Sequence, residues 1–164
     1  MHQRFLRATG LAALVIVLSL PLHSVHAEQA SPLTQLAGNW NGSGTLRLEG
    51  GGSERLACRG YYTTNAGGAG LGLALRCASS SAKIDLRSSL RYRDGRVTGS
   101  WEERSYNASG NVEGRALNGS MNLNITGGGL TGTMAVSFSG PHQSVTITTA
   151  GTGLRGVFIS LRRG

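Results

Sequence analysis

Apolar and polar residues alternate with a period of two along most of the chain. In the stretch 38–48, one set of alternate positions is largely apolar or glycine (Trp40, Gly42, Gly44, Leu46, Leu48) and the other is polar (Asn41, Ser43, Thr45, Arg47). This alternation is typical of a half-buried β-strand. Similar segments recur at intervals of about 10–15 residues, separated by clusters of turn residues. The pattern predicts an all-β, single-domain, antiparallel up-and-down meander of about ten strands, closed or flattened into a barrel.

The turn residues predict the register of neighbouring strands. A tight hairpin at Asp94-Gly95 places Leu86 opposite Glu103. A hairpin centred on Ala108-Ser109 then places Trp101 opposite Ala116. The remaining expected turns lie at Gly50-Gly51-Gly52, 65–68, Ser80-Ser81, Asn118-Gly119, Gly127-Gly128, Pro141-His142 and 152–154. Every register keeps the apolar residues on one face, and the last strand is expected beside the first, which removes both sheet edges.

The same registers arrange charged residues in rows on the outer face. They align Arg87 with Glu102 and Arg115, and Asp85 with Arg104 and Glu113. Both rows alternate in sign, as stabilising cross-strand pairs do.

The two cysteines are expected to face each other across one hairpin. The turn at 65–68 pairs Cys58 with Cys77 on the apolar face. In an oxidising compartment this arrangement predicts a disulfide, and the alternative is two buried free thiols.

The N-terminal residues have the pattern of a secretory signal peptide. Arg4 and Arg7 precede the apolar run 11–20, Pro21 ends it, and Ala27 completes a small-residue cleavage site. We therefore expect a signal peptide over 1–27, a short leader over 28–37 and the barrel domain over 38–164, located in the periplasm or secreted. The formal net charge of +8 favours anionic partners such as envelope components, and nucleic acid is not expected.

The inventory of reactive side chains is sparse. After cleavage His142 is the single histidine, and the paired cysteines leave no set of metal ligands. The motifs GTGLRG at 151–156 and Ser80-x-x-Lys83 lie in expected turns rather than at helix starts. We therefore expect no catalytic residue, no metal site and no enzymatic activity.

Six residues on the apolar face are candidates for contact with a ligand. They are Trp40, Tyr62, Leu86, Trp101, Glu103 and Met134. Glu103 is unusual because a carboxylate on an apolar face is costly unless it is hydrogen-bonded. It either orients a ligand or is satisfied structurally by Ser88, Ser105, a tyrosine hydroxyl or water. The apolar-face glycines either leave a cavity or allow the strands to bend.

The opening Gly38-Asn39-Trp40-Asn41-Gly42-Ser43-Gly44 resembles the first strand of calycin-type barrels, and especially the GxWxGxG opening of nitrobindin-like proteins. That resemblance implies a calycin-like barrel and a haem iron, for which His142 is the only candidate ligand. Because His142 lies in an expected turn at the rim of the barrel, we expect no cofactor. The chain also resembles small exported proteins of alphaproteobacteria, which implies a compartment but no activity.

Three functions remain open at this stage. The first is an exported barrel that binds a small apolar or amphiphilic, lipid-like molecule. The second is an envelope adaptor or inhibitor with a solid core and a basic outer face. The third is a small outer-membrane barrel, which is disfavoured because Glu103 would then meet hydrocarbon. We therefore do not expect an integral membrane protein.

Overall fold

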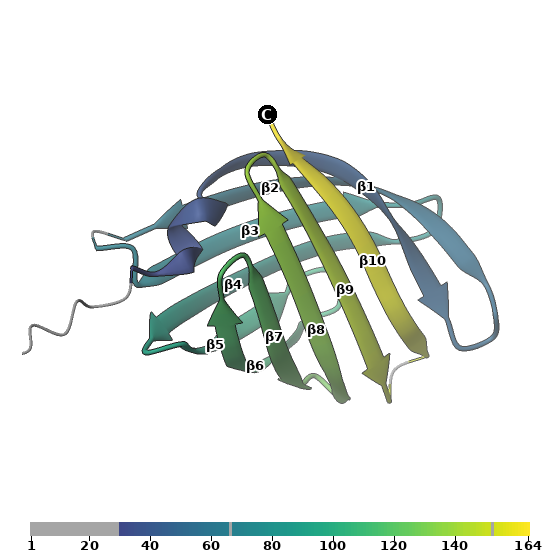
Figure 1. Cartoon of the computed structure of the whole chain (residues 1–164). Helices are drawn as coiled ribbons and strands as arrows, with labels where there is room; N and C mark the ends of the chain where they lie inside the picture. The colour runs from purple at the N-terminus through teal and green to yellow at the C-terminus, as the bar shows by residue number, and fades with distance from the viewer. Residues whose placement is uncertain (1–29, 66, 152) are drawn as a thin grey trace, which may run out of the picture.

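Ten antiparallel strands form a closed barrel in the computed structural model, which describes residues 30–65, 67–151 and 153–164 (Figure 1). A 3₁₀ helix, η1 (Pro32–Leu36), precedes them. The strands are β1 (Gly38–Leu48), β2 (Ser53–Thr64), β3 (Gly70–Ala78), β4 (Lys83–Arg93), β5 (Arg96–Glu103), β6 (Ala108–Leu117), β7 (Ser120–Gly127), β8 (Leu130–Ser139), β9 (His142–Ala150) and β10 (Leu154–Arg163).

Each strand pairs with its neighbours in sequence, and β10 pairs with β1 to close the barrel. The alternate apolar positions point inward and form one continuous core. The predicted fold class, an all-β up-and-down meander closed into a barrel, is therefore confirmed.

Four of the predicted registers are confirmed. The β4–β5 hairpin pairs Leu86 with Glu103. The β2–β3, β3–β4 and β6–β7 hairpins also have the expected pairs, including Cys58 opposite Cys77. Asp94 and Gly95 both have positive φ, at 49° and 79°, as a tight hairpin turn of this kind requires.

The other hairpin registers differ from the prediction, although the inward face is the same. The expected turn at Gly50-Gly51-Gly52 predicts Trp40 opposite Tyr62, but Trp40 lies opposite Gly60. The β7–β8, β8–β9 and β9–β10 registers are likewise displaced by two residues from those that their expected turns predict. The largest change is in β5–β6, where Trp101 lies opposite Gly110 instead of Ala116. The turn there occupies 104–107, and Asn107 takes the positive φ of 52° that a glycine usually supplies.

The β5–β6 register also changes the charge rows. Arg87 lies opposite Glu102 as predicted, but Glu102 faces Ser109 and Arg115 faces Arg96. Of the second row, the backbone N–H of Arg104 donates to the carbonyl of Asp85, while Glu113 forms its ion pair with Arg96. The prediction of long rows with alternating charge is therefore wrong beyond the first pair of each row, Arg87 with Glu102 and Asp85 with Arg104.

The inward glycines allow neighbouring strands to approach closely. A Cβ added to Gly42 would lie 2.0 Å from the carbonyl oxygen of Ser160, and one added to Gly114 would lie 2.1 Å from that of Asn122. Backbone therefore occupies the space beside these glycines, which favours the interpretation that they bend the strands over the interpretation that they leave a cavity.

The helix η1 packs against one end of the barrel. Its Leu33 and Leu36 are fully buried in the core, and Ser31 caps it by accepting a hydrogen bond from the Leu33 N–H. From the sequence this segment was expected to be only a short leader. The predicted signal peptide lies outside the described residues. Among the residues that the structure describes, no helix is long and apolar enough to cross a membrane.

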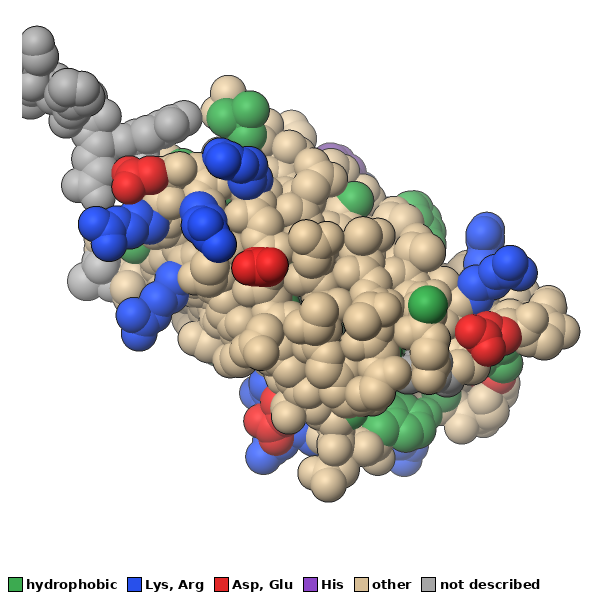
Figure 2. All heavy atoms as spheres, turned by 90° about the horizontal axis from the view of Figure 1, so that it is seen from below, with side chains coloured by type: hydrophobic (Ala, Val, Ile, Leu, Met, Phe, Trp, Pro, Cys, Tyr) green, Lys and Arg blue, Asp and Glu red, His purple; other side chains and the backbone are tan. Residues whose placement is uncertain are grey.

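Charge is distributed unevenly over the barrel. No Lys, Arg, Asp or Glu occurs between Ala116 and Leu154, a segment that spans β7, β8 and β9. Figure 2 shows one face of the molecule on which charged side chains lie toward the borders, around a broad uncharged area. The charged groups therefore belong mainly to β1–β6 and β10.

Candidate functional site

The two ends of the barrel differ in how deeply their inward side chains are buried. The end that η1 covers carries the buried starts of β1 and β3, and at the far end the described residues place no helix. Several inward apolar residues at and toward the far end are only partly buried: Leu86, Ala108, Leu130, Met134 and Ile147. Others there, such as Leu46, Leu56 and Val157, are buried. We call Leu86, Glu103, Ala108, Leu130 and Met134 the rim. Its members come from β4, β5, β6 and β8, which follow one another around the barrel with β7 between β6 and β8.

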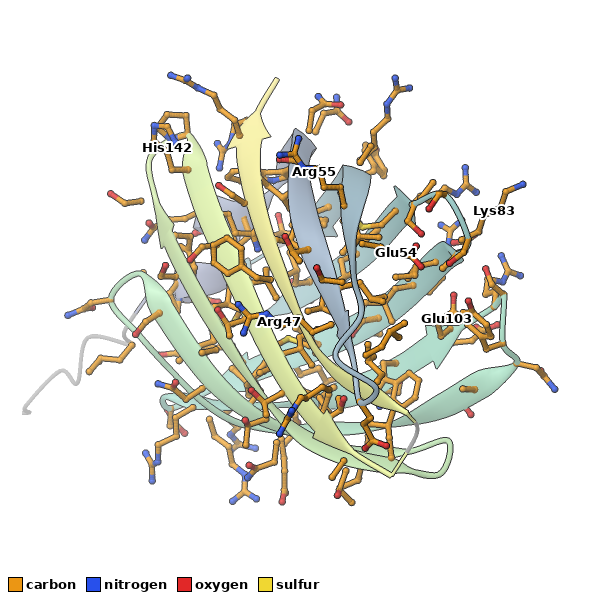
Figure 3. The ribbon with its side chains drawn as sticks, turned by 90° about the vertical axis from the view of Figure 1, so that its right-hand side faces the viewer. Arg47, Glu54, Arg55, Lys83, Glu103 and His142 are labelled. Carbon is orange, nitrogen blue, oxygen red and sulfur yellow. A yellow bond between two sulfur atoms is a disulfide. The ribbon has the colours of Figure 1, made fainter. Side chains whose placement is uncertain are left out.

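Glu103 is held at the rim by backbone donors. Its Oε1 accepts a hydrogen bond from the Asp85 N–H and its Oε2 accepts one from the Tyr106 N–H, both at 2.7 Å. The donor of the first bond belongs to the adjacent strand β4, and the donor of the second belongs to the β5–β6 turn. The side-chain partners expected from the sequence are thus replaced by main-chain amides. Figure 3 shows Glu103 at this end of the barrel.

Trp101 lies one inward position deeper than Glu103 on β5. Its ring is 9% exposed, and its Nε1–H donates to the carbonyl of Thr126 on β7 at 3.2 Å. The indole is therefore fixed in orientation and presents an apolar wall directly beneath the rim.

Trp40 and Tyr62 lie at the opposite, η1-covered end. Their ring centroids are 6.2 Å apart, the Trp40 Nε1–H donates to the Leu36 carbonyl at 2.8 Å, and the Arg163 guanidinium lies 4.8 Å from the Trp40 ring centroid. Burial raises the pKa of Tyr62 to about 12, an effect partly opposed by the neighbouring Gln143 amide. These contacts close that end of the interior.

The predicted ligand-contacting residues therefore form two groups. Leu86, Trp101, Glu103 and Met134 belong to the far-end half of the interior, and Trp40 and Tyr62 belong to the η1 end. Sequence reasoning missed Leu130, whose inward position follows from the same alternation, and Ala108, which was expected in the turn but begins β6 opposite Glu103. It also missed Gln143, a buried amide whose Oε1 has no hydrogen-bond partner.

The predicted disulfide is present. Cys58 and Cys77 are joined across β2–β3, with their Cα atoms 4.1 Å apart. At the nearby β3–β4 turn, the Glu54 carboxylate accepts hydrogen bonds from the hydroxyls of Ser79 and Ser81, which lower the pKa of Glu54.

A groove of about 1390 Å³ lies on the outer face of β1–β4. Its lining includes three small apolar side chains, Ala57, Ala74 and Ala78, and outward-facing cations from β2, β3 and β4. We call this feature the outer groove. Most of the residues that line it point outward from the sheet.

The residues present do not fit a haem or a metal ion. His142 is exposed at the start of β9, and its neighbour Gln143 is the residue that points inward. Among the described residues no three His, Cys, Asp or Glu side chains lie close enough together to hold a metal. The haem implied by the nitrobindin-like opening is therefore not carried over to this chain.

Two solved structures share this fold. The crystal structure of Rv2717c from M. tuberculosis superposes with a TM-score of 0.62 at 14% identity, covering 80% of this chain and 94% of that one. The S-type phycobiliprotein lyase CPES from Guillardia theta superposes with a TM-score of 0.60 at 12% identity, covering 80% and 90%. No protein-family profile and no curated protein matches the sequence.

The expectation that this chain has no enzymatic activity is contradicted, because a protein with the same fold is a lyase by name. At this level of identity the likeness extends to the fold alone. The chain is a closed ten-stranded antiparallel barrel, a fold that it shares with both structures. The resemblance to nitrobindin-like proteins rests on the opening strand alone.

Proposed function

We propose that this barrel binds a small apolar or amphiphilic molecule at its far end, through the rim and Trp101. The observation that carries the proposal is the contrast between the two ends. Trp40, Tyr62 and Leu71 at the η1 end are buried, whereas Leu86, Leu130 and Met134 in the far-end half remain partly accessible although they point inward. The mouths of β-barrels are frequent sites for such ligands.

Each rim residue has a distinct role in this proposal. Leu86 on β4 and Met134 on β8 contribute apolar surface from well-separated strands of the barrel, and Trp101 forms the wall beneath them. Glu103 positions the β5–β6 turn through its bond to the Tyr106 N–H and places negative charge at the entrance. Trp40 and Tyr62 close the interior at its other end and set how deep a ligand can reach.

The experiment is a titration with N-phenyl-1-naphthylamine, a neutral apolar dye, followed by its own fluorescence and by quenching of tryptophan emission. We expect saturable 1:1 binding. Met134→Gln preserves side-chain length but adds an amide to the apolar wall, and we expect it to weaken binding about ten-fold, or about 1.4 kcal/mol. The matched control is Ala135→Gln, on the same strand but on the outer face.

Two results would contradict the proposal. One is the absence of saturable dye binding to the folded wild-type protein. The other is an equal loss of affinity in Met134→Gln and Ala135→Gln, since only the first residue points inward. Circular dichroism of both variants verifies that they are folded.

We also propose that the protein is exported and acts in the periplasm or outside the cell. The charged start, the apolar run and the small-residue site at Ala27 support export, and the Cys58–Cys77 disulfide is compatible with an oxidising compartment. The mass of the protein purified from its native host should match a chain that begins at Glu28. A mass that includes residues 1–27 would contradict export by cleavage.

A further inference from the structure

The outer groove has an arrangement of charge that the fold itself does not compensate. Arg59 on β2 lies directly opposite Arg76 on β3, and like charges in directly opposed positions destabilise a sheet. Arg76 and Arg87 both form ion pairs with Asp85, at 3.3 Å and 3.2 Å. Among the described residues Arg59 has no acidic partner. The groove is therefore lined by three guanidinium groups and one carboxylate, which pairs with only two of them.

Lys83 adds a further cation at the edge of the same groove. It begins β4 and lies opposite Ala78, and Figure 3 shows its side chain extending away from the barrel. Arg76 is largely exposed, with 68% of its side chain accessible, so its guanidinium can reach a bound molecule while still near Asp85. The groove is thus net positive, and an anion bound between Arg59 and Arg76 would relieve their repulsion.

Small apolar side chains border this row of arginines on both sides. Ala57 lies opposite Ala78 on one side, and Tyr61 lies opposite Ala74 on the other. The Tyr61 ring is 59% exposed, which is unusual for an aromatic side chain on the face of a sheet. A molecule held by its charge on Arg59 and Arg76 would therefore lay an adjoining apolar part on alanine methyl groups and on the tyrosine ring.

From this charge complementarity we propose that the outer groove is a binding site for a single-chain anionic amphiphile, a molecule with a phosphate head and an apolar tail. Arg59 and Arg76 bind the phosphate, and Ala57, Ala74 and Tyr61 contact the tail. The site goes beyond the function proposed for the rim and is independent of it, because these side chains point outward from β2 and β3 while the rim residues point into the barrel.

The test is calorimetric titration of the mature protein with dodecyl phosphate below its critical micelle concentration. We expect 1:1 binding at least ten-fold tighter than that of inorganic phosphate, which has the head but no tail. Dodecyltrimethylammonium, with the same tail and the opposite charge, should not bind to the groove. Backbone amide shifts in ¹⁵N NMR spectra should move on β2 and β3 around Arg59 and Arg76, and not around Met134 or Leu130.

Arg59→Gln is the diagnostic variant because it removes one member of the like-charged pair. We expect it to weaken dodecyl phosphate binding at least ten-fold while the melting temperature stays the same or rises. A residue with a merely structural role would instead lower the melting temperature. Arg93→Gln is the matched control, since Arg93 is 92% exposed at the end of β4, outside the groove, and its loss should leave binding unchanged.

Each other outcome overturns the proposal in a recognisable way. Equal affinity for inorganic phosphate and dodecyl phosphate would show an anion site with no role for the alanines. Binding only to phosphatidylglycerol vesicles would show attachment to a membrane surface. Shifts at the rim without shifts on β2 and β3 would assign the amphiphile to the barrel interior, and loss of binding in Arg93→Gln as well would show a non-specific effect of net charge.

Discussion

At the scale of single residues, the inward polar groups are satisfied in ways that residue type alone does not reveal. Glu103 could be recognised from the sequence as an acid on an apolar face, but its partners are main-chain amides of Asp85 and Tyr106. Almost every residue type has a main-chain amide, so the pattern of apolar and polar side chains could not predict these hydrogen bonds. The candidate site was therefore predictable as a set of inward positions and not as a set of contacts.

Tyr62 provides a test at this scale through its ionisation. Burial raises its pKa from 10.0 to about 12, so the folded state disfavours the phenolate. The stability that this group contributes is fully present below pH 10 and is lost as the pH rises from 10 toward 12. A shift of this size corresponds to about 2–3 kcal/mol.

We therefore expect urea-unfolding experiments between pH 9 and about pH 11.5 to show a steeper alkaline loss of stability for the wild type than for Tyr62→Phe. Tyr61→Phe is the control, because it removes the same hydroxyl group from an exposed position. Identical pH profiles for the wild type and Tyr62→Phe would contradict the assignment.

At the scale of strands and hairpins, the apolar pattern determines the face of a strand but not its exact partner. A slip by two residues leaves every side chain on the same face, so Trp40 can move from Tyr62 to Gly60 without breaking the pattern. Where the turn carries its own signal, as Asp94-Gly95 does, the pairing follows correctly. The β5–β6 turn has no glycine, and its position could not be predicted because Asn107 supplies the positive φ.

The inward glycines give a direct test of these registers. In Gly114→Ala the new methyl group would meet the Asn122 carbonyl oxygen, and we expect a loss of about 1–3 kcal/mol or more in the free energy of unfolding. Gly50→Ala in the β1–β2 turn is the control, since a Cβ there meets no atom within 4 Å. Chemical denaturation measures both, and a neutral effect of Gly114→Ala would mean that β6 and β7 are farther apart than described.

At the scale of the whole molecule, the disulfide and the closure of the barrel act on different states of the chain. The β1–β10 pairing stabilises the native sheet by leaving no free edge. The Cys58–Cys77 bond joins residues separated by 19 positions and restricts the unfolded ensemble. The two contributions should therefore be separable.

We expect the Cys58→Ala/Cys77→Ala double variant to fold into the same barrel with about 3 kcal/mol less stability than the oxidised wild type. The measurement is guanidinium unfolding followed by tryptophan fluorescence, with the reduced wild type as a second reference. Equal stability of oxidised and double-variant proteins would show that the bond adds nothing to the barrel.

The adjacency of β1 and β10 makes the chain nearly circular. The Gly164 N–H donates to the Asn39 carbonyl at 3.0 Å, so the start of the first strand and the end of the last one already touch. A peptide link from Gly164 to the segment that carries η1 would add little to this geometry, and the glycine-rich turn between β1 and β2 offers a place for new termini. A circularly permuted gene that begins in this turn should therefore encode the same barrel, although its strands are translated in a different order.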